Sequence, residues 1–90
     1  MLSMTAAAAS LVADLTSDAA LPDSAGLRIE TNPATRSLRM GLAPSPEPAD
    51  EVVVAHGARL FLAPGTPDRL DGKVLGAEIS EERRVFFLDG

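Results

Sequence analysis

Cysteine is absent from the 90 residues of this chain. Its absence excludes disulfide bonds, thiolate metal sites and cysteine nucleophiles, and it removes the residue that would report the redox compartment. Tryptophan and tyrosine are also missing, so three phenylalanines are the only aromatic residues. Phe61, Phe86 and Phe87 lie in strand-like segments and are expected in the core. Because side chains alternate along a strand, either Phe86 or Phe87 must face outward.

Long apolar runs and an excess of positive charge are missing as well. No run approaches the roughly 20 apolar residues that cross a bilayer, and residues 1–15 lack the basic start of a secretion signal. We therefore expect a cytoplasmic protein that does not enter a membrane. Eight basic against 13 acidic residues give a net charge of -5. This charge repels phosphate backbones and makes nucleic-acid binding unfavourable.

The residues that are present suffice for one small core. Hydrophobic residues make up 46% of the chain and charged residues 23%, which is ordinary for a globular protein. A length of 90 residues leaves no room for a second domain. We therefore expect residues 1–90 to form a single domain.

The first segment predicts an amphipathic helix that ends within residues 16–20. Ser3 or Thr5 can cap its first N–H groups, and the breakers of residues 21–26 follow it. Apolar residues recur at the spacing of one helical face, namely Met4, Ala8, Leu11, Val12 and Leu15.

After Gly26 the apolar period changes to two. Residues 27–31 and 38–42 alternate apolar and polar side chains, which predicts two half-buried strands joined as a hairpin. The hairpin loop, within residues 31–37, is small and polar, and we expect it to be the most mobile internal segment. The following residues, 43–50, carry proline at positions 44, 46 and 48 and predict an extended connector.

The second half of the chain predicts further strands. Residues 51–55 and 58–63 form a second hairpin around His56-Gly57. Residues 64–72 predict one helical turn, with Thr66 as cap, Pro67 as first residue and Gly72 at its end. Apolar alternation at 75–79, a turn at 81–83 and an apolar run at 85–88 predict the last strand pair. Together these segments predict an α+β fold, with one N-terminal helix packed on about six strands in β-hairpins.

The order of these segments resembles the HesB/IscA-like, or A-type, family of iron–sulfur cluster biogenesis. A Gly-Leu-Arg strand at 26–28 is followed by a Pro-x-Pro-x-Asp connector at 46–50. A His-Gly hairpin at 56–57 then leads into an apolar strand, and Leu-Asp-Gly stands at 70–72. The resemblance implies a HesB-like domain over residues 1–90. Members of this family act as scaffolds or carriers in iron–sulfur cluster assembly.

The resemblance also implies where cluster ligands would lie. Family members use one cysteine in the loop after the Gly-Leu-Arg strand and a Cys-Gly-Cys pair near the C-terminus. Here the loop 31–37 holds no cysteine, and the chain reaches Gly90 without the pair. Iron–sulfur clusters need soft sulfur ligands. We therefore predict no catalytic, cofactor-binding or metal-binding residue and no cofactor.

Other polar residues carry only weak functional signals. His56 is the single histidine and fits an exposed turn better than a metal ligand, because no second histidine or cysteine accompanies it. Ser24 and Ser80 lack any recognisable histidine and acid partners, so an enzyme is not expected. Carboxylates cluster in three places and indicate solvated acidic surface before a hard-cation site, namely at Asp50 and Glu51, at Asp68 and Asp71, and at Glu78, Glu81 and Glu82.

Three arginines around the first hairpin leave two alternatives open. Arg28, Arg36 and Arg39 form a positive patch for an acidic partner, or they pair with Glu30 and solvent. The second alternative is the more ordinary one.

Two functions fit these observations. The first is a cysteine-less accessory or binding protein whose partner is an iron–sulfur assembly protein. The second is a structural or regulatory domain unrelated to iron. A homodimer is also expected, because the apolar strands at residues 52–54 and 85–88 carry more large side chains than one alanine-rich helix can cover.

Overall fold

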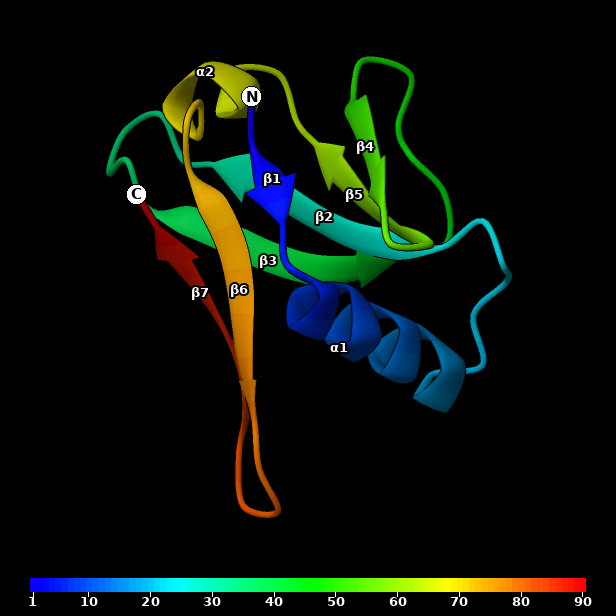
Figure 1. The fold of residues 1–90 in the computed structure, drawn as a ribbon. Coiled ribbons are helices and arrows are strands. Elements are labelled where there is room, and N and C mark those ends of the chain that lie inside the picture. Colours follow the sequence, from blue (N-terminus) through cyan, green and yellow to red (C-terminus); the bar gives the residue numbers. More distant parts are fainter.

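Helix α1 spans Ala6–Asp18 in the computed structural model, which describes residues 1–90 (Figure 1). Thr5 caps it, because its Oγ1 accepts the N–H of Ala8 at 3.1 Å. Leu11 and Val12 are buried on its inner face. The predicted amphipathic helix and its end near residue 18 are confirmed.

The architecture is α+β, as predicted, with two helices and seven strands in two sheets. The sequence predicted about six strands because a two-residue strand at the N-terminus carries no local signal. The remaining elements are β1 Ser3–Met4, β2 Gly26–Thr31, β3 Leu38–Ala43, β4 Glu51–Ala55, β5 Ala58–Leu62, α2 Thr66–Arg69, β6 Val74–Ile79 and β7 Arg84–Asp89.

The larger sheet has the strand order β3-β2-β5-β4. Both predicted hairpins are present, β2 with β3 and β4 with β5, and the two hairpins join through a parallel pairing of β2 with β5. Gly26 begins β2 beside Arg59, and a Cβ atom at position 26 would collide with the backbone carbonyl oxygen of Arg59. Glycine therefore permits the close approach of the two hairpins at this point.

The smaller sheet has the order β1-β6-β7. The parallel register of β1 places Ser3 opposite Val74 and Met4 opposite Leu75. The assignment of Met4 to the helical face was therefore wrong. Its side chain is buried as predicted, at 4% exposure, but from a strand.

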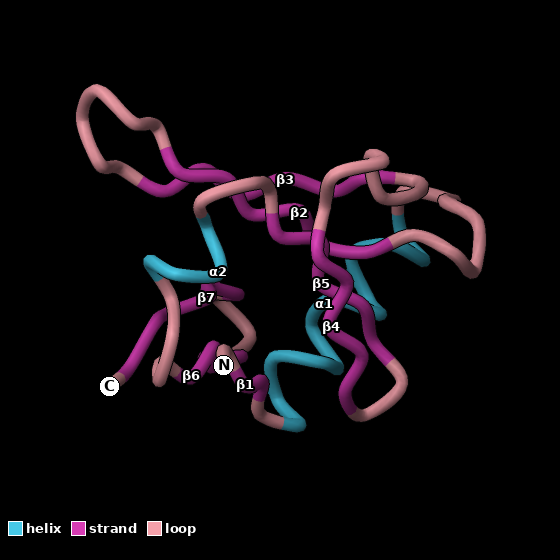
Figure 2. Tube along the Cα trace, turned by 90° about the horizontal axis from the view of Figure 1, so that it is seen from above, coloured by secondary structure: helices cyan, strands magenta, loops and turns pink.

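The core lies between the two sheets and α1 (Figures 1 and 2). Seen from above in Figure 2, β2 and β3 lie on one side of the molecule and β1, β6 and β7 on the other. The core cluster has 13 buried members drawn from both sheets and α1: Leu2, Met4, Ala8, Ala9, Val12, Leu27, Ile29, Val53, Ala58, Leu60, Leu62, Leu70 and Leu75.

The apolar side chains of the edge strands β3 and β7 are more exposed than the alternation of the sequence predicts. Met40 and Leu42 face the same side as Ile29 and Leu27, but they remain 37% and 38% exposed because β3 lies at the edge of its sheet. Phe86 packs against the core, and Phe87 is 48% exposed. The prediction that one of these two phenylalanines faces outward is confirmed.

The short helix α2 differs from its prediction at both ends. Gly65 is its N-cap, at φ 86°, and Thr66 is its first residue, so the assignment of Thr66 as cap was wrong by one position. Its C-cap is Leu70, and Gly72 stands in the next turn at φ 76°. Glycine readily adopts this left-handed conformation, whereas threonine pays a steric penalty. Neither helix is long and apolar enough to traverse a lipid bilayer.

Candidate functional site

The loop between β2 and β3, residues 32–37, occupies the position at which the resemblance places a ligand. Asn32 organises it: its Oδ1 accepts the N–H of Ala34 at 2.9 Å, and its carbonyl accepts the N–H of Arg36 at 2.7 Å. Arg36 has a positive φ of 61°. The hydroxyls of Thr35 and Ser37 bond to each other at 2.8 Å. The polar side chains of this loop therefore bond mostly within the loop.

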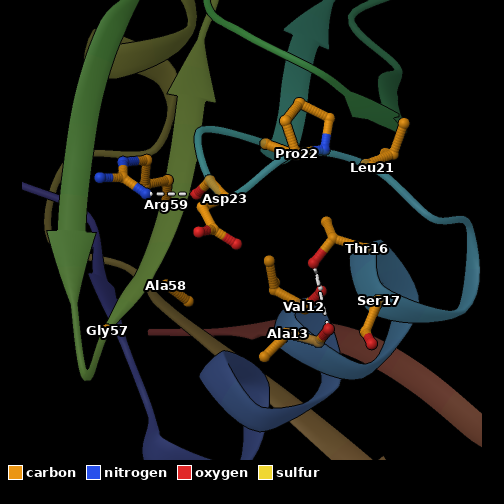
Figure 3. Close-up of a pocket in the computed structure, with 11 residues that line it drawn as sticks. Val12, Ala13, Thr16, Ser17, Leu21, Pro22, Asp23, Gly57, Ala58 and Arg59 are labelled. Atoms are coloured by element: carbon orange, nitrogen blue, oxygen red, sulfur yellow. Dashed lines mark hydrogen bonds between the residues drawn. The ribbon is translucent and has the colours of Figure 1, made fainter.

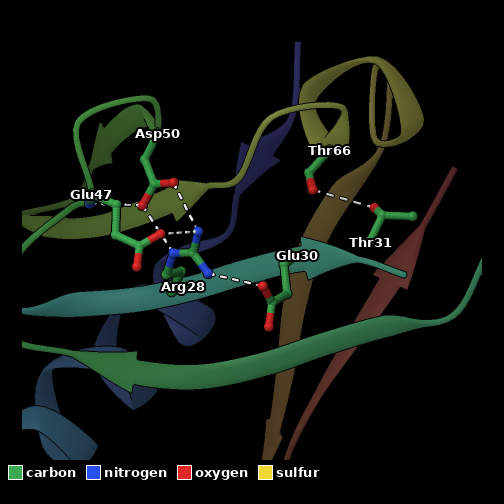
Figure 4. A network of polar contacts seen from close by, with 6 residues as sticks. All are labelled: Arg28, Glu30, Thr31, Glu47, Asp50 and Thr66. Carbon is green, nitrogen blue, oxygen red and sulfur yellow. Dashed lines mark hydrogen bonds and ion pairs between the residues drawn. The ribbon is translucent and has the colours of Figure 1, made fainter. Parts of the chain in front are cut away.

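Helix α2 holds the base of this loop. The guanidinium of Arg69 donates to the carbonyl of Arg36 at 2.9 Å. Thr31, at the end of β2, shares a hydrogen bond of 3.3 Å with Thr66 (Figure 4). Thr66 is completely buried, so this contact satisfies its hydroxyl. The loop is thus anchored through its backbone and does not present a set of converging ligands.

Arg28 is the centre of an ion-pair network on the outer face of β2 (Figure 4). Its guanidinium donates to both carboxylate oxygens of Asp50, from Nε at 3.0 Å and from Nη2 at 3.1 Å. It also donates to Glu30 at 3.0 Å and to Glu47 at 2.7 Å. Glu47 and Asp50 belong to the connector between β3 and β4, so the network pins this connector onto the sheet.

The Asp50 side chain is fully shielded from solvent, and that of Arg28 is 19% exposed. The hydrogen bonds from Arg28 hold the pKa of the Asp50 carboxyl below its ordinary value of 3.8, against the opposing effect of burial. The N–H of Glu47, which donates to Asp50 at 3.0 Å, lowers this pKa further. The same pair with Asp50 raises the pKa of Arg28. Both groups are therefore held in their charged forms.

The positive patch considered for Arg28, Arg36 and Arg39 is not formed. Arg28 is surrounded by three carboxylates, which supports the alternative of pairing with Glu30. Arg39 lies opposite Glu30 in the strand register. Three carboxylates thus accompany the three arginines, and all three carboxylates are bonded to Arg28, so no net positive patch forms at this hairpin.

The remaining polar residues do not come together. His56 lies in the turn between β4 and β5 at φ 50°, exposed as expected. The Asp50–Glu51 pair is split, because Asp50 is held by Arg28 while Glu51 faces solvent. No group of three or more histidines or carboxylates is placed to hold a metal ion. Ser24 donates to the carbonyl of Pro44 at 2.9 Å, which makes its hydroxyl structural.

The largest hollow, about 320 Å³, lies between the C-terminal half of α1, the loop 21–25 and the β4–β5 hairpin (Figure 3). Arg59 closes one side, with Nη1 donating to the carbonyl of Asp23 at 2.7 Å. The hydroxyl of Thr16 donates back to the helix, to Val12 at 3.0 Å and to Ala13 at 3.1 Å. No nucleophile and base are paired in this hollow, so it contains no catalytic arrangement.

Comparison with solved structures identifies the fold. The chain is similar to Escherichia coli SufA, involved in biosynthesis of iron–sulfur clusters, at a TM-score of 0.79 and 22% identity over 98% of this chain and 83% of that one. It is also similar to IscA with the [2Fe-2S] cluster, at a TM-score of 0.75 and 22% identity, covering 99% of this chain and 84% of that one. A third similar structure is that of a protein from Aquifex aeolicus, at a TM-score of 0.76 and 17% identity, covering 99% of this chain and 90% of that one. The chain has the SufA/IscA fold.

The sequence itself is more distant. No family model matches it, and no curated protein does. The fold predicted from the order of the motifs is therefore shown by the comparison of structures and not by the comparison of sequences.

Within the SufA/IscA fold, the residues of this chain do not fit an iron–sulfur cluster. The loop 32–37 offers hydroxyl, amide and guanidinium groups, and the whole chain offers no thiol. The donors that are present are already bonded to one another or to α2. Clusters are held by thiolate sulfur, with imidazole replacing it only in part. A cluster therefore has no ligand set here.

The ion pair of Arg28 with Asp50 is the feature that sequence reasoning missed. Arg28 was weighed as surface charge, and Asp50 as half of an acidic pair. The available signal was a lone arginine flanked by Leu27 and Ile29 in a strand, followed by an acidic connector of fixed length. A charge in a sheet that is covered by a loop requires a counter-charge from that loop.

Proposed function

We propose that this protein is a non-enzymatic, cytoplasmic binding protein that contacts an iron–sulfur assembly protein without carrying a cluster. One observation carries the proposal: the SufA/IscA fold covers 98% of the chain, while the chain lacks every thiolate. The fold supports a role beside proteins of that kind, and the absent thiolates argue against a carrier role for these residues.

The surface around the β2–β3 hairpin is the proposed contact. Two hollows of about 290 and 270 Å³ adjoin there and share Glu30 and Arg39. Arg39 is exposed and forms no ion pair, in contrast to Arg28. Asn32 and Pro33 extend the second hollow toward the loop. The surface thus carries one exposed, unpaired arginine between two shallow hollows. Such a surface suits contact with another protein better than it suits binding of a small molecule, which needs a deeper cavity.

The test is direct binding to a cysteine-bearing protein of the same fold from the source organism. Calorimetry would compare that protein in its apo and cluster-loaded forms. We expect saturable binding, weakened about tenfold or more by Arg39→Glu, because a reversed charge at the centre of a contact costs about 1.4 kcal/mol or more. The matched control is Arg83→Glu, an exposed arginine in the turn between β6 and β7.

Equal affinity of the Arg39→Glu and Arg83→Glu variants would move the contact away from this hairpin. No binding to either form of the partner would reject the proposal. The structural or regulatory role unrelated to iron would then stand.

A further inference from the structure

Strand β4 forms one edge of the larger sheet and has a partner only on its β5 side (Figure 1). Its sequence is Glu-Val-Val-Val-Ala. Val53 is buried, whereas Val52 and Val54 are 44% and 61% exposed. Valine favours extended backbone, and an edge strand leaves a row of backbone N–H and C=O groups without partners. β4 therefore already has the conformation that a further strand needs on its open side.

The hairpin geometry fixes which backbone groups of β4 are free. The turn residues His56 and Gly57 have φ values of 50° and 79°, as in a two-residue type I′ turn. The residues that flank such a turn form a hydrogen-bonded pair, and hydrogen-bonded pairs recur at every second residue along the strands. Val53 is therefore bonded to β5. The N–H and C=O groups of Val52 and Val54 point away from β5, and no other residue bonds to them.

The other sheet edges are less open to pairing. Strand β1 has only two residues and leads directly into α1. Edge strand β7 begins with Arg84 and ends with Asp89, and edge strand β3 carries Arg39. Charged residues on an edge discourage pairing with another chain. After Glu51, β4 has no charge, proline or bulge, so it is the edge most open to a further strand.

The charges around β4 indicate what kind of segment it would receive. Glu51 is exposed and forms no ion pair, and the nearby Glu47 keeps 68% of its side chain exposed. The one cation of the neighbouring strand β5, Arg59, is directed to the carbonyl of Asp23. The chain as a whole has a net charge of -5. These charges attract a segment with a basic residue and oppose an acidic one.

We propose that β4 binds an extended segment of another protein as an additional antiparallel strand, with a basic residue of that segment opposite Glu51. The two residues opposite Val52 and Val54 exchange backbone hydrogen bonds with them and lie beside their exposed side chains, so β-branched residues fit there. In strand addition the main chain provides the affinity and alternate side chains provide the specificity. The segment is therefore short, β-branched at alternate positions and uncharged except at its basic end.

This binding edge goes beyond the proposed function. It lies at the opposite edge of the larger sheet from β3, away from the contact surface proposed around the β2–β3 hairpin. Its test uses a synthetic peptide and no iron–sulfur protein. Failure of one proposal therefore leaves the other unaffected.

The probe is the peptide Thr-Val-Thr-Val-Lys-amide, which carries fluorescein at its N-terminus. In the antiparallel register its valines lie opposite Val54 and Val52, and its lysine lies opposite Glu51. Fluorescence anisotropy measures binding. Methylation of the backbone nitrogens of both valines removes the N–H groups that donate to β4, whereas methylation of both threonine nitrogens alters N–H groups that point away from it. We expect the first change to weaken binding about tenfold or more, and the second to change it less than about twofold.

A charge exchange tests the preference for a basic residue. We expect Glu51→Lys to weaken binding of the lysine peptide about threefold or more, and to favour a second peptide that ends in glutamate in place of lysine. The matched control is Glu82→Lys, which makes the same change of charge at an exposed residue in the turn between β6 and β7. This variant should bind both peptides as the unchanged chain does.

Amide hydrogen exchange followed by NMR locates the bound peptide. We expect the amides of Val52 and Val54 to become protected when the lysine peptide is added. The amide of Val53, which is already bonded to β5, should change little.

Three results would overturn the proposal. Absence of binding up to about millimolar lysine peptide, or equal weakening by the two patterns of methylation, would exclude strand addition. Equal binding of the lysine and glutamate peptides to the unchanged chain would exclude the basic segment. Protection of Val52 and Val54 without peptide, increasing with protein concentration, would assign this edge to a second copy of the chain instead.

Discussion

The ring of Phe87 lies over Gly76 on the neighbouring strand, where a Cβ atom would come within 2.5 Å of the ring's Cζ. The two residues are direct partners in the register of β6 with β7. An aromatic ring over a glycine covers backbone that would otherwise face solvent. The outward-facing Phe87 therefore packs one side of its ring on Gly76, although the residue remains 48% exposed.

Substitution of this glycine tests the contact. Gly76→Ala should push the ring of Phe87 outward and cost about 1 kcal/mol of unfolding free energy, measured by urea denaturation. In Gly76→Ala/Phe87→Ala the two losses should not add, because the clash disappears with the ring. Gly41→Ala is the matched control, since nothing lies within 4 Å of a Cβ atom there and β3 should tolerate it. Additive losses at positions 76 and 87 would show that the ring does not rest on Gly76.

The pair of Arg28 with Asp50 should govern stability in acid. The pKa of Asp50 is lowered from 3.8, so its contribution is present above that value and is lost as pH falls through the folded-state pKa below it. Asp50→Asn should cost about 2 kcal/mol or more near pH 7, because it breaks a buried pair and leaves Arg28 undercompensated. It should also flatten the decline in stability below 3.8.

Urea denaturation across this pH range measures both effects of Asp50→Asn. Asp14→Asn, an exposed carboxylate of α1 without an ion pair, is the control and should change little. An Asp50→Asn variant with the acid profile of the unchanged protein would show that the acid transition arises from other carboxylates.

Anaerobic reconstitution with iron and sulfide should leave the protein colourless after desalting. The reason is the absence of thiolates in the loop 32–37 and in the rest of these residues. Absorbance and iron and sulfide content are the measurements, with a cysteine-bearing protein of the same fold as positive control. A stable chromophore with stoichiometric iron and sulfide would contradict this expectation.

Hydrogen exchange should be fastest, among internal segments, within residues 31–37. Several amides there bond only to side chains or within the loop, as Ala34 does to Asn32, while Val53 pairs with Leu60 inside the sheet. Mass spectrometry after deuterium labelling can compare the two segments. Protection of the loop equal to that of Val53 would indicate that its anchors to Arg69 and Thr66 dominate its motion.

The elements that local patterns predict correctly are those with their own period or turn chemistry. Alternation located β2, and the His56-Gly57 turn located the β4–β5 hairpin. Strand β1 could not be found in this way, because Met4 fits the helical spacing and only its distant partner Leu75 makes it a strand. The Arg28–Asp50 pair was missed for the same reason, since it joins residues 22 positions apart.

The sequence predicted the direction in which strand side chains point better than it predicted how far they are exposed to solvent. The side chains of Met40 and Leu42 point to the predicted side, yet β3 lies at the sheet edge and the core does not reach across it. The order of strands in a sheet determines this coverage, and a sequence period carries no information about that order.

The pairing of β1 with β6 couples folding to translation. Leu2 and Met4 are synthesised before Val74 and Leu75, and they are buried only when these residues of β6 are available to cover them. At a synthesis rate of about 5–20 residues per second, the nascent chain spends several seconds with these side chains uncovered. Strand β1 therefore reaches its buried position only after β6 has been made, although its own residues are synthesised about 70 positions earlier.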